Sequence, residues 1–150
     1  AAALAARLAQ GAPGRALALD LTAYQQTRRE AFELLRAGLA AGRPGPYAAS
    51  VFRLSESTRA SKEKLESLSE ILYSVLQDIV YLQSGFPEAV RNVDTVPELS
   101  QLAQRVRPSS LPRLIEELDR VQSAARRNAF RPLALAGWAL GLAAEDDAMR

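Results

Sequence analysis

Hydrophobic residues recur every three or four positions along most of this chain, and clusters of proline and glycine separate the segments that show this rhythm. Such a period is typical of helices that bury one face. The strongest example runs from about Thr58 to Ser84, where the apolar stripe is wider than a solvent-facing helix needs. About 26 residues of helix would span on the order of 40 Å, so we expect this helix to be the spine of a bundle. Its stripe consists of Leu65, Leu68, Ile71, Leu72, Val75, Leu76, Ile79, Val80 and Leu82.

Two breaker clusters divide the first part of the chain. Residues 1–10 have a helical pattern that stops at a Gly-Ala-Pro-Gly turn. Residues 15–41 should form one long helix or two nearly continuous ones, with the polar Arg28, Arg29 and Glu30 between the apolar positions. Those positions are Leu17, Leu21, Tyr24, Phe32, Leu35 and Leu39. A Gly-Arg-Pro-Gly-Pro cluster then turns the chain before a short helix over residues 47–54.

The second half of the chain predicts three further helices. They cover residues 96–105, 111–128 and 131–144. Thr95 and Glu98 have the spacing of a capping box at the start of the first of these, and Pro108 begins the break before the second. The last is apolar around most of its circumference, so it should be central or covered by a partner chain. No run of residues alternates as a strand would, and the predicted fold class is therefore all-α.

Composition narrows the possible functions. A hydrophobic fraction of 48% with 24% charged residues fits one compact globular domain. The absence of histidine and cysteine removes thiolate and imidazole metal ligands and the commonest nucleophile and proton-transfer groups, so we expect no metal and no cofactor. The lack of cysteine also fits a reducing cytoplasm. A net charge of +2 is too small to indicate nucleic-acid binding by itself.

Two features of the chain's extent complete this picture. The longest apolar run, residues 133–144, is shorter than the roughly 20 residues that span a bilayer, so we expect no membrane span. The chain does not begin with methionine, and we expect it to be a fragment of a longer protein.

Several residues could carry chemistry, and each has a structural alternative. Asp78 lies in an apolar segment and could act as an acid or base, but we expect it at the edge of the stripe, paired with an arginine of a neighbouring helix. The turn at residues 11–15 could hold a phosphate or could simply break a helix. Residues 126–128, Arg-Arg-Asn, could also bind phosphate or could favour a helix carboxy-terminus electrostatically.

The aromatic residues Tyr73, Tyr81 and Trp138 could stack on nucleobases, but their helical spacing among leucines favours packing in the core or an interface. No catalytic constellation remains, and we expect no enzymatic activity. Two functions of other classes stay open. One is a small all-α enzyme of the chorismate-mutase type, and the other is a DNA-binding helical domain.

The order of four motifs resembles a known family. They are the Gln-Gly-Ala-Pro-Gly-Arg-Ala-Leu turn at residues 10–17, the long helix followed by Asn92-Val93-Asp94, the Pro108-Ser109 break, and a helix that leads to Arg127-Asn128 before an apolar last helix. This order resembles the carboxy-terminal half of the delta-prime subunits of the bacterial DNA polymerase III clamp loader. There the turn, with serine where this chain has Ala12, ends the lid of an AAA+ module, and a helical collar domain follows.

The resemblance implies two regions, the end of an AAA+ lid domain over residues 1–22 and a helical collar domain of the clamp-loader type over residues 23–150, in a bundle of about five to six helices. It implies a non-catalytic oligomerisation domain that belongs to the DNA polymerase III holoenzyme in the bacterial cytoplasm. The partners would be the gamma/tau and delta subunits, with the sliding clamp and primed DNA engaged by the whole assembly. The collar of the gamma/tau ATPase subunit is the closest alternative.

ATP-binding members of the wider family carry an arginine, called sensor 2, in a Gly-x-x-Arg turn. The matching position here is Gly14, and Arg15 lies one residue further, which rotates its side chain by about 100 degrees on a helix. The resemblance therefore implies a degenerate turn, formed by Gly11, Gly14 and Arg15, that does not sense nucleotide.

The wide apolar stripes and the apolar last helix also predict a surface for partner subunits. The expected subunit-interface residues are Leu133, Leu135, Trp138, Leu140, Arg127, Asn128, Asn92 and Asp94. We expect Leu133, Leu135, Trp138 and Leu140 to divide between the core and the interface.

Overall fold

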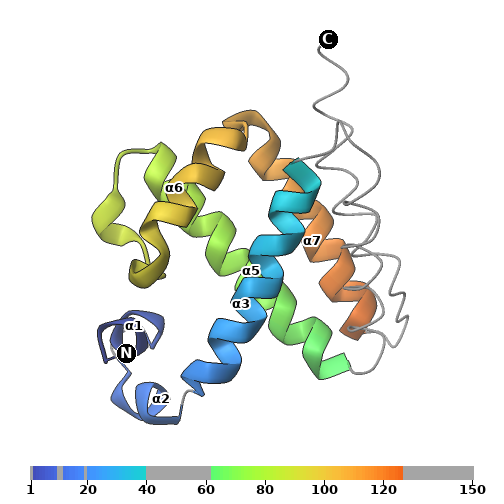
Figure 1. Ribbon diagram of the computed structural model, residues 1–150. Helices are drawn as coiled ribbons and strands as arrows, with labels where there is room; N and C mark the ends of the chain where they lie inside the picture. Colours follow the sequence, from blue (N-terminus) through green and yellow to red (C-terminus); the bar gives the residue numbers. More distant parts are fainter. Residues whose placement is uncertain (1, 10–11, 19, 40–61, 127–150) are drawn as a thin grey trace.

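The computed structural model describes residues 2–9, 12–18, 20–39 and 62–126 (Figure 1). The α-helices are α1 (Ala2–Leu8), α2 (Pro13–Ala18), α3 (Leu21–Leu39), α5 (Lys62–Gln83), α6 (Val96–Arg105) and α7 (Leu111–Arg126), and the 3-10 turns are η1 (Pro87–Ala89), η2 (Val93–Thr95) and η3 (Pro108–Ser110). Every regular element in these ranges is helical, which confirms the predicted all-α bundle. The helices expected over residues 47–54 and 131–144 lie outside the described residues.

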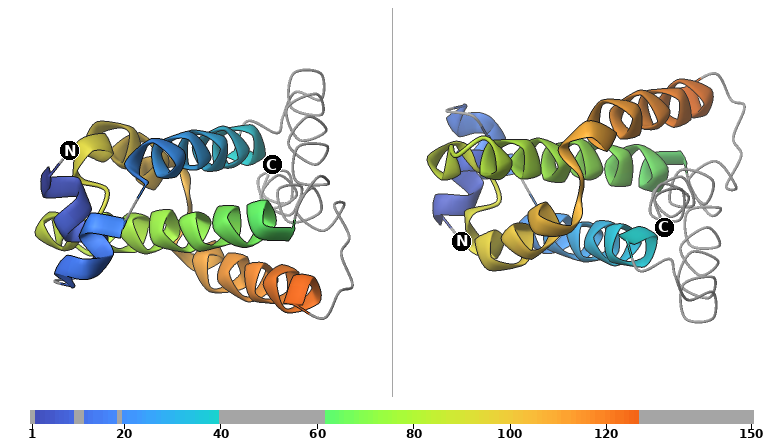
Figure 2. Two further views of the ribbon diagram at one scale, coloured as in Figure 1. Left: turned by 90° about the horizontal axis from the view of Figure 1, so that it is seen from below. Right: turned by 90° about the horizontal axis from the view of Figure 1, so that it is seen from above.

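Helix α5 is the spine of the bundle, as its pattern predicts. It packs against α3, α6 and α7, and Figure 2 shows it lying between α3 and α7. Most of its wide stripe is buried because these neighbours surround it, and Val80 and Leu82 are half-buried. The fully buried members are Leu68, Leu72, Val75, Leu76 and Ile79. Tyr73 and Tyr81 pack partly buried against this core, which confirms their predicted packing role.

Of the two arrangements predicted for residues 15–41, one long helix or two nearly continuous ones, the structure shows the second, with α2 followed by α3. Asp20 separates them because its Oδ1 accepts hydrogen bonds from the backbone N–H groups of Thr22 and Ala23, both at 3.0 Å. An aspartate that caps two amides in this way begins a new helix. Leu17, part of the predicted apolar face, lies on α2 before this break and is 89% exposed, whereas Leu34 of α3, which the pattern did not include, is buried.

Helix α6 has the predicted bounds but not the predicted cap. The Thr95 hydroxyl donates to the carbonyl oxygen of Asn92 at 3.2 Å, so it turns back into η2 and does not cap α6. Glu98 forms an ion pair with Arg36 of α3 at 3.2 Å. The capping-box prediction was wrong because a 3-10 turn precedes the helix and takes up the hydroxyl.

Candidate functional site: a buried polar network at the link between α5 and α6

Residues 84–95, which we call the link, connect α5 to α6 and turn back along α5. Gly85 makes the turn possible because its φ of 80° favours glycine. Its N–H donates to the Leu82 carbonyl at 3.2 Å, and the Phe86 N–H donates to the Tyr81 carbonyl at 2.9 Å. This pair of bonds is the Schellman arrangement that ends many helices. The link then returns far enough for Asn92 to lie beside the middle of α5.

Asp78 of α5 holds the returning link. One carboxylate oxygen accepts the Arg91 N–H at 2.9 Å, and the other accepts the Asn92 N–H at 3.0 Å and the Asn92 side-chain amide at 2.7 Å. Asp78 has no exposed surface. The expectation that it lies at the stripe's edge and pairs with an arginine was therefore wrong: it is a core residue that accepts hydrogen bonds from a nearby loop.

Asn92 joins three segments of the chain and is itself fully buried. Its Oδ1 accepts the Tyr24 hydroxyl at 2.7 Å and Nη1 of Arg28 at 2.9 Å. Its amide donates to Asp78 and, at 3.3 Å, to the Ser74 hydroxyl oxygen. Both donors and both lone pairs of the amide are thus in use. An asparagine at this position fixes the distance between α3, α5 and the link.

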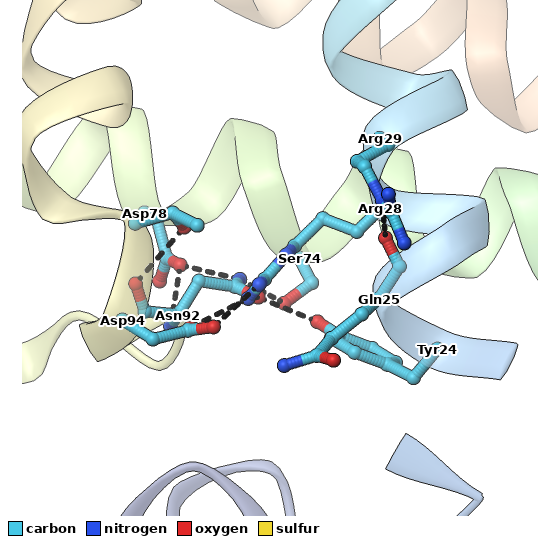
Figure 3. A network of polar contacts seen from close by, with 9 residues as sticks. Tyr24, Gln25, Arg28, Arg29, Ser74, Asp78, Asn92 and Asp94 are labelled. Atoms are coloured by element: carbon cyan, nitrogen blue, oxygen red, sulfur yellow. Dashed lines mark hydrogen bonds and ion pairs between the residues drawn. The ribbon is translucent and has the colours of Figure 1, made fainter. Parts of the chain in front are cut away.

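Arg28 of α3 completes the arrangement, although the sequence pattern places it between the apolar positions of that helix. It makes a bidentate ion pair with Asp94, with contacts of 2.7 and 2.6 Å, and its side chain is only 5% exposed against 35% for Asp94. Its guanidinium carbon also lies 5.5 Å from the centre of the Tyr24 ring. Figure 3 shows Arg28 reaching from α3 to the two link residues. We call Tyr24, Arg28, Ser74, Asp78, Asn92 and Asp94 the link network.

The network shifts two pKa values. The hydrogen bond from Arg28 lowers the pKa of Asp94 below its ordinary value of 3.8, against the opposing effect of partial burial. Burial raises the pKa of the Tyr24 hydroxyl above 10.0. Asp94 is therefore ionised and Tyr24 is protonated throughout the neutral range, so the ion pair and the hydrogen bond to Asn92 coexist.

The polar groups of the network hold parts of the chain together. Its donors and acceptors are matched with one another, and neither of the buried unpartnered side-chain oxygens found among the described residues, on Glu30 and Gln83, belongs to it. Both oxygens of Asp78 accept hydrogen bonds from the link. A carboxylate held in this way stabilises a loop, whereas an acid or base must reach a substrate proton.

A groove of about 440 Å³ lies beside the network, between α1, α3 and α5. Its lining mixes apolar, hydroxyl and charged side chains: Leu8, Asp20, Ala23, Tyr24, Thr27, Ser67, Glu70, Ile71, Ser74 and Arg91. Within the ranges that the structure describes, no cluster of three acidic side chains could hold a metal ion. No described helix is long and apolar enough to cross a membrane.

The candidate site residues predicted from the sequence lie in different parts of the chain, and the structure describes only some of them. Asn92 and Asp94 lie together in the link network, and the contacts that the structure gives them are internal. Gly14 lies on α2, exposed, with open space around its Cα, and Arg15 lies on the same helix. The remaining candidates lie outside the described residues: Gly11, Arg127, Asn128, Leu133, Leu135, Trp138 and Leu140. The interface prediction stays a prediction.

Sequence reasoning missed the network as a unit, although a signal was present. Tyr24 and Arg28 are four residues apart, as are Ser74 and Asp78, so each pair presents polar groups on one face of a helix. Arg28 interrupts the apolar face of α3, and Asp78 lies within an apolar segment of α5. Polar pairs on two neighbouring stripes indicate a shared buried polar contact.

Comparison with known proteins identifies a family for this chain. The family described as "DNA polymerase III, delta subunit, C terminal" matches residues 49–142, nearly two thirds of the chain. The matched span contains α5, the link, α6 and α7. No curated protein and no solved structure matches the chain. The chain therefore belongs to the family of DNA polymerase III delta-subunit carboxy-terminal domains, and through it to the clamp-loader subunits.

Proposed function

We propose that this chain is a non-catalytic oligomerisation domain that joins one clamp-loader subunit to its neighbours in the DNA polymerase III assembly. The observation that carries the proposal is the family match over residues 49–142, which spans most of the bundle. The link network supports it, because its polar groups are used to hold helices together and not to meet a substrate. The assembled loader, in the bacterial cytoplasm, would place the sliding clamp on primed DNA.

The subunit is the finer part of the proposal, and we assign it to delta-prime. The Gly-Ala-Pro-Gly-Arg turn and the Asn92-Val93-Asp94 link favour this assignment, and Gly14 at the sensor 2 position agrees with a subunit that does not hydrolyse ATP. The family description names the delta subunit, so delta is the alternative that an experiment must separate from delta-prime. We expect delta and delta-prime to occupy different places in the assembled loader, so that one should not replace the other.

A sizing column distinguishes these assignments. The full chain at micromolar concentration is mixed with gamma/tau and delta, or with gamma/tau and delta-prime, all from one organism. A delta-prime domain enters a complex in the first mixture and competes with the added subunit in the second, whereas a delta domain does the reverse. If the folded chain elutes alone from both mixtures, the oligomerisation function is wrong.

A matched pair of variants tests the expected interface. Trp138→Ala removes an aromatic side chain from the predicted partner surface, and Phe86→Ala removes one that is 55% exposed on the link. We expect Trp138→Ala to weaken assembly and Phe86→Ala to leave it unchanged, because large aromatic residues at interface centres carry much of the binding energy. Equal assembly of both folded variants would contradict the role of the last helix.

A further inference from the structure

The link is held from two sides by different parts of the chain. On one side lies the link network. On the other lies α1, which contacts η2 and whose Arg7 donates from Nη1 to the carbonyl oxygen of Glu88 in η1 at 2.8 Å. Figure 1 shows α1 next to the link and on the opposite side of the molecule from α7. The docking surface for α1 is thus partly made of the link.

The position of that surface depends on a few anchors. Within the link, Val90 and Asn92 are fully buried, and the remaining residues are exposed or half-buried. The 3-10 turns have only three residues each, so they cannot hold their own geometry against solvent. Asp78, Asn92 and Arg28 therefore fix where η1 and η2 lie.

Asp94, the partner of Arg28, differs from these anchors in being accessible. Asp78 and Asn92 have no exposed surface, whereas the Asp94 side chain is 35% exposed. Asp94 also belongs to η2, the turn that contacts α1. The Arg28–Asp94 pair is the point at which the network meets both solvent and the surface that receives α1.

We propose that the link network is a conformational clamp for α1: when the Arg28–Asp94 pair opens, the link shifts and α1 leaves the bundle while α5, α6 and α7 stay folded. The clamp goes beyond the oligomerisation function and does not depend on it, because it involves only contacts within this chain. Its consequence lies at the amino-terminal end, since α1 is where the sequence predicts the end of a lid domain. Opening the clamp would free that end from the bundle.

Amide hydrogen exchange of the full chain tests the clamp. The reporters for α1 are the amides of Ala9 and Ala12, which donate to the carbonyls of Ala5 and Ala9 at 2.9 and 3.0 Å. In Asp94→Asn we expect their exchange to be about tenfold faster, as loss of a hydrogen bond between charged groups predicts. The rate should stay independent of low urea concentrations, which identifies a local opening.

Two further variants give the test its controls. Arg36→Met removes a different α3 arginine from its ion pair with Glu98 and should leave the exchange of Ala9 unchanged. Arg7→Gln removes the contact with Glu88 and should speed exchange at Ala9 but not at the Arg91 and Asn92 amides, because the network remains intact.

Two results would overturn the clamp. Unchanged exchange at Ala9 and Ala12 in Asp94→Asn, with faster exchange at Arg91 and Asn92, would mean that the link moves without α1. Equal acceleration of α1 and α5 amides with the same urea dependence would mean that α1 opens only on global unfolding. Neither result bears on the sizing-column experiment, so failure of the clamp and failure of the oligomerisation function are separable.

Discussion

Two arginines on α3 make similar contacts in very different surroundings. Arg28 pairs with Asp94 of η2, and Arg36 pairs with Glu98 of α6. The two arginines are eight residues apart and their acidic partners are four residues apart. Each guanidinium also lies over an aromatic ring of its own helix, at 5.5 Å for Arg28 and 5.8 Å for Arg36. The two arginines therefore have the same kinds of partner, one carboxylate and one aromatic ring.

Burial separates them. The Arg28 side chain is 5% exposed and makes two short contacts with Asp94 and one with Asn92, whereas the Arg36 and Glu98 side chains are 46% and 49% exposed and meet once, at 3.2 Å. Water screens the exposed pair and can replace either partner, but it cannot reach most of the buried network. The residue types in an ion pair therefore do not determine how much it contributes to stability. The number of buried groups that depend on the pair is the better guide.

The largest effect is expected for the innermost acceptor. Asp78→Ala leaves the Arg91 and Asn92 backbone amides and the Asn92 side chain without their buried acceptor, so the free energy of unfolding should fall by about 3–5 kcal/mol. Urea unfolding followed by circular dichroism at neutral pH measures this loss. Glu98→Ala removes an exposed acid and serves as the control. A cost for Asp78→Ala within about 1 kcal/mol of the control would mean that the link does not need its acceptor.

A smaller loss is expected for Arg28→Met. The methionine fills the buried space, and the freed Asp94 is exposed enough to bind water, while Asn92 keeps the Tyr24 hydroxyl. We expect a loss of about 2–3 kcal/mol in the same unfolding experiment. A double-mutant cycle with Asp94→Asn isolates the pair, and additive losses would show that the two residues do not interact energetically.

Acid should weaken the buried pair in a defined pH window. The pKa of Asp94 is lower in the folded protein than its ordinary value of 3.8 because Arg28 favours the carboxylate. The resulting stability is fully present above about pH 5 and is lost as pH falls through the folded pKa. The difference in unfolding free energy between the wild type and Asp94→Asn should therefore shrink between about pH 5 and about pH 2. A constant difference over that range would contradict the assignment of the pKa shift to this pair.

The helices follow from the sequence more closely than the network does. The bounds of α6 agree with the pattern at both ends, and the stripe of α5 is buried as expected, because burial of apolar surface has the same period as the helix. The failure at Thr95 has a local cause. A capping box and a preceding 3-10 turn compete for one hydroxyl, and sequence spacing does not show which contact forms.

The network required information that helical periodicity does not contain. The donors that satisfy Asp78 are backbone amides 13 and 14 residues away, brought back by a turn at Gly85. The sequence pattern places Arg28 between the apolar positions, and arginine is mostly exposed in proteins. Only the spatial meeting of three segments makes its burial favourable. The resemblance identified Asn92 and Asp94 as important residues without indicating their internal contacts.

The smallest effect is expected for Arg36→Met. Both partners of this ion pair keep access to water, so its removal should change the free energy of unfolding by no more than about 0.5 kcal/mol. Raising the salt concentration to about 1 M should remove even that difference, because screening acts on exposed charges. The cost of Arg28→Met should persist at the same salt concentration, because the Arg28 side chain and its partner Asn92 are buried away from ions.

This last variant decides how the comparison is understood. Arg28→Met and Arg36→Met make the same chemical change on the same helix, so differences in helix propensity and side-chain entropy largely cancel between them. Suppose that Arg36→Met lowers the free energy of unfolding as much as Arg28→Met does, and that both effects vanish in high salt. Long-range charge on α3, and not burial, would then determine how much each pair contributes to stability. If only Arg28→Met is costly in high salt, then the buried contacts to Asn92 and Asp94 are what give one arginine its structural role.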